Sequence, residues 1–215
     1  MTTLVERLRR LSAAVISDVQ RNLQTTYAMD PAIRAIVPGV RLAGPAFTVL
    51  ARSGSIITVH RALLEAPAGS VLVVGGETAQ SPNGALFGKL MATQAALRGI
   101  AGIVVDGPVR DCAELQEMKF PTFARGATPH VGLNRVVGET QVVVSCGSLI
   151  VNPGDYVLGD DDGVAVIPAS LVEKVVAAAE DRLAKEDDFL ARMHAGEHLT
   201  DMIGFSALIY GKQEG

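Results

Sequence analysis

Tryptophan is absent from this chain of 215 residues, and aromatic residues together supply only 4% of it. Basic residues are also in the minority, because 19 Lys and Arg stand against 23 Asp and Glu and leave a formal net charge of -4. Nucleic-acid surfaces are usually basic, and single-strand binders add aromatic side chains on which bases stack. The composition therefore predicts that nucleic acid is not a partner.

Cysteine is scarce too, with only Cys112 and Cys146, which lie far apart in the sequence. Neither belongs to a Cys-x-x-Cys pair, so no disulfide framework or zinc knuckle is predicted, and Cys112 is interpreted as a small packing residue. The N-terminus lacks the basic and apolar segments of a signal peptide, and no apolar run reaches the roughly 20 residues that span a bilayer. We expect a cytoplasmic protein with no membrane partner.

Several catalytic signatures are missing as well, namely GxSxG, HExxH and GxGxxG. Residues 83–91 superficially resemble a nucleotide-binding loop that opens a helix. A P-loop, however, needs four residues between its glycines and a Ser or Thr after its lysine. Here three residues separate Gly84 from Gly88, and Leu90 follows Lys89. We therefore expect no nucleotide cofactor.

Two other segments with candidate metal ligands favour simpler interpretations. His194 and His198 have i, i+4 spacing, but Gly196 weakens a helix there and the residue order differs from the zincin motif. Residues 160–163 lie between two apolar runs and end in the Asp-Gly pair typical of a tight turn. We predict a hairpin turn at residues 160–163 and no metal site at either segment.

Apolar residues, by contrast, make up 48% of the chain, which is enough to bury a sizeable core in one domain spanning residues 1–215. The first 30 residues carry apolar positions at helical spacing from Leu4 to Val19. Strands are predicted at 44–50, 71–74, 103–105 and 121–123, and helices at about 56–65, at about 85–98 and after Arg110. Such alternation is typical of βαβ units around a parallel sheet.

After Gly132 the pattern changes to short apolar segments separated by Gly, Pro and Asp, which predict antiparallel or mixed strands. These segments are residues 141–145, 148–151, 155–158 and 163–167. Ser170 and Glu173 then have the spacing of a capping box and predict a long helix to about Met193. The expected fold is a single α/β domain with a helical N-terminus and a long C-terminal helix.

The first candidate site is an Arg-Asp pair, Arg110 and Asp111, directly beyond the apolar run 103–105. Ligands collect at the carboxyl ends of strands in open α/β sheets, so this position favours function. Arg110 offers a planar cation suited to a carboxylate, and Asp111 offers oxygen ligands suited to Mg²⁺ or Mn²⁺. The alternative is that Asp111 caps the following helix and Arg110 pairs with a surface acid.

The second candidate site is the glycine-led helix start at residues 84–91. The free backbone N–H groups at such a start, together with the helix dipole, favour a bound anion. The alternative is that the glycines only allow the helix to pack closely.

Taken in order along the chain, these segments resemble the RraA-like family, and more narrowly its branch of 4-hydroxy-4-methyl-2-oxoglutarate/4-carboxy-4-hydroxy-2-oxoadipate aldolases. The resemblance covers nearly the whole chain, and its most specific element is the GxVxDGxxRD-type stretch that ends at Asp111. The segments that carry it are residues 14–18, 44–49, 88–91, 99–111, 123–129 and 153–164.

This resemblance implies a compact α/β/β sandwich assembled as a homotrimer or a dimer of trimers, with active sites at subunit interfaces. It implies that Arg110 binds the pyruvyl part of the substrate and that Asp111 helps to hold a divalent metal, Mg²⁺ or Mn²⁺. It also implies that backbone amides of one turn contact the substrate, and that turn comprises Gly88, Lys89, Leu90 and Met91.

Aldolases of this family take a catalytic base from the C-terminal helix of a neighbouring subunit, and the matching residue here is Glu186, with Asp187 as the second choice. The helix at about 170–194 would then pack at a subunit interface. From the residues alone, a solvated helix face rich in Lys and Glu is the better interpretation of this segment. One position departs from the family, because Lys89 stands where an acidic residue is common. A cation there either weakens metal binding or grips an extra substrate carboxylate.

The residues and the resemblance together predict a class II pyruvate aldolase that cleaves a 4-hydroxy-2-oxo dicarboxylic or tricarboxylic acid into pyruvate and a second keto acid. The same enolate site would allow oxaloacetate decarboxylation. The rival prediction from the same family is a non-catalytic regulator that binds and inhibits an endoribonuclease.

Overall fold

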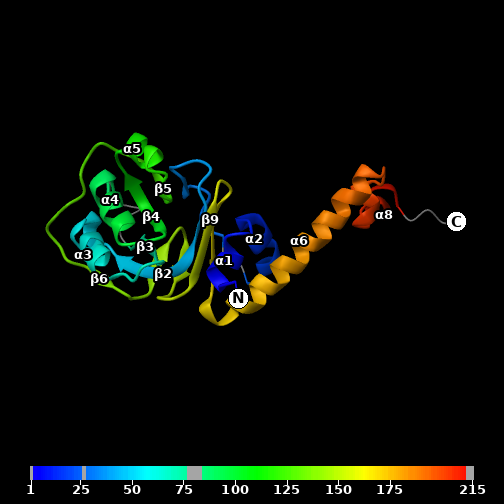
Figure 1. Ribbon diagram of the computed structural model, residues 1–215, viewed down its shortest axis with the longest axis horizontal. Coiled ribbons are helices and arrows are strands. Elements are labelled where there is room, and N and C mark those ends of the chain that lie inside the picture. The colour runs from blue at the N-terminus through cyan, green and yellow to red at the C-terminus, as the bar shows by residue number, and fades with distance from the viewer. Residues whose placement is uncertain (1, 26–27, 77–83, 212–215) are drawn as a thin grey trace.

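Figure 1 shows the computed structural model of the chain, which describes residues 2–25, 28–76 and 84–211. The helices are α1 (Leu4–Leu8), α2 (Ala13–Asn22), α3 (Ile57–Glu65), α4 (Lys89–Leu97), α5 (Cys112–Glu117), α6 (Val172–His194), α7 (Leu199–Met202) and α8 (Ser206–Tyr210). The strands are β1 (Arg34–Ala35), β2 (Leu42–Leu50), β3 (Val71–Gly75), β4 (Gly102–Val109), β5 (Thr122–Ala127), β6 (Glu139–Thr140), β7 (Val144–Cys146), β8 (Leu149–Val151), β9 (Tyr156–Asp160) and β10 (Gly163–Ile167).

The central sheet has the strand order β1-β5-β4-β3-β2-β9-β10, with β6 pairing on β2. Strands β2 to β5 are parallel, and the helices α3, α4 and α5 connect them. Strands β9 and β10 are antiparallel, and the two residues between Asp160 and Gly163 form their turn. The parallel βαβ prediction and the hairpin prediction are both confirmed.

Strand β2 is the corner of the sheet. Its first half, Leu42–Pro45, pairs with β9, whereas its second half, Ala46–Leu50, pairs with β3. The sheet curls at this strand, so that β9 lies across the interior from β5. A Cβ atom on Gly159 of β9 would come within 2.8 Å of the Phe123 ring of β5, which explains why only glycine fits there. The curled sheet is the β/β part of the predicted α/β/β sandwich.

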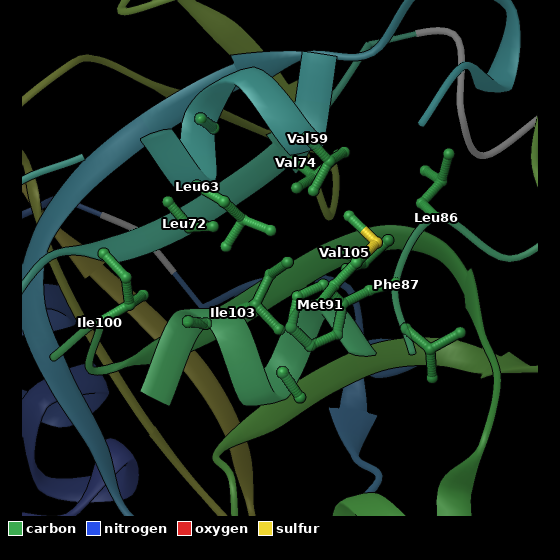
Figure 2. Close-up of a cluster of buried hydrophobic side chains, with 14 of the residues drawn as sticks. Val59, Leu63, Leu72, Val74, Leu86, Phe87, Met91, Ile100, Ile103 and Val105 are labelled. Carbon is green, nitrogen blue, oxygen red and sulfur yellow. The ribbon is translucent and has the colours of Figure 1, made fainter. Parts of the chain in front are cut away.

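Helices cover the outside of this sheet on two sides (Figure 1). Helices α3, α4 and α5 pack on the parallel strands, and Figure 2 shows Val59, Leu63 and Met91 pointing into their buried cluster. Helices α1, α2 and α6 form a separate apolar cluster over β9 and β10. The interior of the curl is a third cluster, which includes Phe123, Val157 and Val166. The predicted fold class is therefore confirmed.

Helix α6 leaves the body of the protein after its first half, which holds its buried residues Val172, Val175, Val176 and Ala179. The remainder, with α7 and α8, extends away from the sheet as a C-terminal arm of residues 180–211 (Figure 1). Eight large apolar residues of this arm are exposed: Leu190, Met193, Leu199, Ile203, Phe205, Leu208, Ile209 and Tyr210. No helix in the described part of the chain is long and apolar enough to cross a membrane.

Several predicted boundaries are wrong. The N-terminal helical pattern is divided into α1 and α2, because the Ser12 side chain starts a new helix by accepting a hydrogen bond from the Val15 N–H. Of the strand predicted at 141–145, only residues 144 and 145 are in a strand, β7, which pairs with β8, whereas β6 precedes the predicted segment and pairs with β2.

Two predicted helix starts are also misplaced. Residues 85–88 are not helical, because Ala85 pairs with Val131 and the Leu86 N–H donates to the Pro108 carbonyl. Ser170 does not form a capping box, since α6 begins after a 3₁₀ turn and its N-cap, Leu171, makes no side-chain cap.

Candidate active site

The Arg-Asp pair lies at the carboxyl end of β4, which continues past the predicted run to Val109 despite a register shift between Val105 and Pro108. The Arg110 N–H donates to the Phe87 carbonyl at 3.0 Å and so joins the two segments that the sequence singled out. Asp111 has φ 58° and ψ 42°, a left-handed conformation that Asp tolerates better than most residues. This turn separates the strand from α5.

The Asp111 carboxylate does not cap its own helix α5. Its Oδ2 atom instead accepts a hydrogen bond from the Lys89 N–H at 2.9 Å and lies 3.6 Å from Arg110 Nε. Asp111 therefore caps the start of α4, a helix that follows another strand. The capping interpretation of Asp111 was right about the type of interaction and wrong about the helix.

Gly88, the N-cap of α4, is required because the Arg-Asp pair approaches its backbone closely. A Cβ atom there would lie 2.6 Å from Asp111 Oδ2 and 2.9 Å from Arg110 Cγ. The glycine thus makes room for the two charged side chains rather than for helix packing. The next two amides, of Leu90 and Met91, have no acceptor among the described residues and so remain available to an anion.

These groups share one small cavity of about 100 Å³. It is lined by Ile56, His60, Ala85, Phe87, Gly88, Leu90, Met91, Arg110, Asp111 and Val131. Phe87 and Met91 are also buried in the core beside Val105, which fixes the start of α4 against the sheet (Figure 2). Pockets for drug-sized ligands measure about 300–1,000 Å³, so a cavity of this size suits a small acid.

A second, more open hollow of about 390 Å³ adjoins the first and shares Arg110 and Asp111 with it. Cys112, Ala127, Thr128 and Pro129 complete its lining. Burial, and then the charges of Asp111 and Glu114, raise the pKa of the Cys112 thiol. Cys112 is therefore protonated at neutral pH, as a packing residue is expected to be.

His60 is the lining residue that sequence reasoning missed. It stands on α3, one helical turn beyond Ile56, and both residues line the cavity. No motif contains it, and only the packing of α3 beside α4 brings it to the site. A histidine at helical spacing from an apolar residue was the available signal, but that signal alone does not distinguish a cavity wall from a solvated face.

Asp111 is the carboxylate that could hold a metal in this cavity. Among residues 2–25, 28–76 and 84–211, no three His, Cys, Asp or Glu side chains form a metal-binding group. This donor set does not suit structural zinc, which takes four protein ligands. It does suit Mg²⁺ or Mn²⁺, because such ions are commonly held by one or two carboxylates and complete their shell with water and substrate oxygens.

Glu186 and Asp187 lie outside this site. Both are on α6, on the opposite side of the protein from α4 and α5 (Figure 1). Glu186 Oε1 lies 3.2 Å from Arg182 Nε, and Arg182 Nη2 in turn donates to Asp18 at 2.5 Å. Within one chain, the structure therefore brings together Arg110, Asp111 and the α4 turn but not the candidate base.

Residues 13–166 match the model of the RraA-like family, described as Aldolase/RraA. The chain belongs to the RraA-like family. A relative from Halalkalibacterium halodurans named "Putative 4-hydroxy-4-methyl-2-oxoglutarate aldolase" is 32% identical over 85% of each chain. One of the same name from Burkholderia multivorans is 38% identical over 68% of this chain and 88% of its own. The predicted family is thus confirmed.

Solved structures of the family have the same fold. An uncharacterized protein from Pseudomonas syringae pv. tomato superposes with a TM-score of 0.82 and 27% identity, covering 92% of this chain and 91% of that chain. Streptomyces coelicolor RraAS2, described as an unusual member of the RNase ES inhibitor RraA protein family, gives a TM-score of 0.76 and 30% identity over 89% of this chain and 97% of its own. A structure named for the RNase ES inhibitor RraA family thus shares this fold, whereas the relatives named for an aldolase match this chain in sequence.

Proposed function

We propose that this RraA-like protein is a divalent-metal-dependent class II pyruvate aldolase that acts on 4-hydroxy-2-oxo acids of the 4-hydroxy-4-methyl-2-oxoglutarate type. The observation that carries the proposal is the convergence of Arg110, Asp111 and the free amides of α4 on one small cavity. The names of relatives at 32% and 38% identity support the same reaction.

The residues of the cavity divide the chemistry between them. Arg110 and the amides of Leu90 and Met91 would bind the carboxylate and keto oxygen of the pyruvyl half, since these three residues line the same cavity and offer hydrogen-bond donors. Asp111 would hold the divalent cation, which when bound polarises the keto group as a Lewis acid. The same donors would stabilise the enolate charge that develops as the carbon–carbon bond breaks, and such stabilisation usually lowers the barrier more than any other single effect.

The base in this proposal is Glu186 of a second copy of the chain, which would take the proton from the C4 hydroxyl. The C-terminal arm supports this arrangement because it leaves its own domain and exposes a large apolar surface, which a neighbouring subunit would bury. We accordingly propose a homotrimer or a dimer of trimers. The free thiols of Cys112 and Cys146 suit the reducing cytoplasm, where we propose that it acts.

Pyruvate release tests the function directly. The substrates are 4-hydroxy-4-methyl-2-oxoglutarate and, separately, oxaloacetate, each with Mg²⁺, with Mn²⁺ and with EDTA. Oxaloacetate also decarboxylates without enzyme, so a protein-free blank is subtracted. We expect metal-dependent release from both substrates. Arg110→Ala should lower turnover of both by about 100-fold or more, as the loss of a fixed charge-stabilising donor does.

Arg98→Ala is the matched control, because Arg98 lies at the far end of α4. It should keep full activity. Full activity in Arg110→Ala, or release that EDTA does not diminish, would contradict the aldolase proposal. Circular dichroism of both variants separates a lost function from a lost fold.

A second candidate function needs its own test, because the RraAS2 structure resembles this chain over 89% of its length. In that case the protein would bind an endoribonuclease and slow RNA cleavage without any turnover of keto acids. An RNA-cleavage assay with a purified RNase E-type enzyme measures this. Inhibition that persists in Arg110→Ala, together with an absence of pyruvate release, would favour the regulator over the aldolase.

A further inference from the structure

Helix α3 presents three different faces, and one of them belongs to the site. Val59, Ala62 and Leu63 are buried in the core (Figure 2 labels Val59 and Leu63). On a second face, the Arg61 Nε atom donates to Glu65 at 2.7 Å. On the third face, His60 and Ile56 line the cavity that holds Arg110. The position of His60 on the cavity wall is thus set by the same periodicity that anchors the helix.

The cavity contains few ionisable side chains. Of its ten lining residues, only His60, Arg110 and Asp111 can carry a charge. Arg110 and Asp111 enter from the β4–α5 connection and contact each other. His60 enters from a different element, and its ring has no hydrogen-bond partner among the described residues. The other lining residues are apolar apart from Gly88.

We propose that His60 is a specificity-determining residue that binds a second carboxylate of the substrate, remote from the keto acid. This inference rests on the proposed function, in which the keto acid end occupies Arg110 and the α4 amides. A second carboxylate at this end of the cavity would otherwise meet apolar side chains, and His60, which is exposed at the cavity wall, supplies the hydrogen-bond donor that they lack. The imidazole donates a hydrogen bond whether it is neutral or protonated, so it can serve at neutral pH.

The inference therefore assigns a residue to the second carboxylate that the proposed substrates, of the 4-hydroxy-4-methyl-2-oxoglutarate type, already carry. Monocarboxylic keto acids would occupy only the Arg110 end of the cavity. Lys89 is the competing cation, because its side chain is exposed at the start of α4 and could reach a substrate carboxylate from outside. If His60 binds the second carboxylate, replacing His60 weakens its binding and replacing Lys89 does not. If Lys89 binds it, the reverse holds.

Equilibrium binding measurements distinguish His60 from Lys89 without relying on turnover. Titration calorimetry in Mg²⁺ compares pyruvate with 2-oxoglutarate, which adds a second carboxylate to the same keto acid end. The proteins are the unmodified chain, His60→Leu, Lys89→Met and Arg110→Ala, and the first two of these variants each remove a hydrogen-bond donor. His130→Leu is the matched control, because it makes the same change at an exposed histidine that does not line the cavity.

We expect the unmodified protein to bind 2-oxoglutarate about tenfold or more tightly than pyruvate, the factor typical of one hydrogen bond to a charged group. His60→Leu should remove this preference and leave pyruvate affinity unchanged. Arg110→Ala should weaken the binding of both ligands, and His130→Leu should weaken neither. Equal affinity of the unmodified protein for both ligands would overturn the inference. So would a preference that survives in His60→Leu or disappears in Lys89→Met.

Cleavage kinetics then keep this inference apart from the function on which it rests. For 4-hydroxy-4-methyl-2-oxoglutarate, His60→Leu should raise KM about tenfold or more and change kcat little, because it removes a contact that is equally strong in the bound substrate and in the transition state. A preference for 2-oxoglutarate without any cleavage would refute the aldolase while leaving the role of His60 intact. Cleavage without a preference for 2-oxoglutarate would support the aldolase and refute the role of His60.

Discussion

The Asp111 carboxylate accepts a hydrogen bond from the Lys89 N–H at 2.9 Å, so one residue joins the carboxyl end of β4 to the start of α4. The same oxygen lies 3.6 Å from Arg110 Nε. Asp111 is thereby both a helix cap and the proposed metal ligand. These two roles can be separated, because an amide oxygen can cap a helix but binds a divalent cation more weakly than a carboxylate does.

Asp111→Asn and Asp111→Ala should therefore differ in stability but not in activity. Both should lose metal-dependent pyruvate release. Asp111→Ala should also lower the free energy of unfolding by about 1 kcal/mol, the usual cost of a lost cap, whereas Asp111→Asn should lower it less. Urea unfolding of the two variants measures the difference. Equal stabilities would show that the bond to Lys89 contributes little.

Gly88→Ala should displace the Arg-Asp pair. The added methyl group would lie 2.6 Å from Asp111 Oδ2, closer than carbon and oxygen can approach, while the φ of −167° is an ordinary extended value. Activity should therefore fall sharply without backbone strain at Gly88 itself. In a double-variant cycle with Asp111→Ala, the stability losses should be less than additive, because removal of the carboxylate removes the clash. If the two stability losses are strictly additive, the methyl group added at Gly88 does not clash with the Asp111 carboxylate.

Mixed oligomers should reveal the origin of the base. If Glu186 serves the site of a neighbouring copy, then Arg110→Ala and Glu186→Gln should each be inactive alone and regain part of the activity when they are unfolded and refolded together. The mixture contains some sites with both Arg110 and Glu186 intact. Asp188→Asn on the same helix is the control and should stay active. A mixture as inactive as its components would assign Glu186 no role across an interface.

Arg125 should contribute to stability on the face of the sheet away from the site. Its Nε donates to Asp106, whose side chain is only 7% exposed, and its Nη1 lies 3.2 Å from Asp30. Arg125→Met should cost about 3 kcal/mol, since it leaves a buried carboxylate without its cation. The double variant with Asp106→Asn should recover part of this loss. Denaturant unfolding of the two single variants and the double variant gives the coupling free energy between Arg125 and Asp106.

The same cluster predicts a pH dependence. The Ala32 N–H, and next the Arg125 guanidinium, hold the pKa of Asp30 below 3.8. A carboxyl group with a lowered pKa in the folded state stabilises the protein above its unfolded pKa and loses this contribution as pH falls through the folded value. Stability should therefore decline below about pH 4, and less so in Asp30→Asn. Acid unfolding curves that are identical for the two proteins would contradict this assignment.

The parallel strands and their connecting helices were predictable because the spacing of apolar residues, and the length of each apolar segment, indicate which side chains are buried. The Arg-Asp pair and the α4 turn were each recognisable, since each follows a strand. Their mutual contact was not, because it depends on hydrogen bonds between segments that are separate in the sequence, from the Arg110 N–H to the Phe87 carbonyl and from the Lys89 N–H to Asp111. His60 was missed for the same reason, as its place in the site comes from the packing of α3. The capping box predicted at Ser170 is wrong, because the Ala169 N–H donates to the Asp155 side chain at 3.1 Å and residues 169–171 form a 3₁₀ turn before α6.

The corner strand has a consequence for synthesis of the protein. Leu42 pairs with Gly159, so the first half of β2 has no partner until β9 has left the ribosome. Pairings between such distant segments are slow to form, and unpaired strand edges invite aggregation in the meantime. The parallel layer of β2 to β5 can assemble earlier, because its strands follow one another along the chain. The nascent chain would thus carry a nearly formed cavity around Arg110 while its sheet is still open.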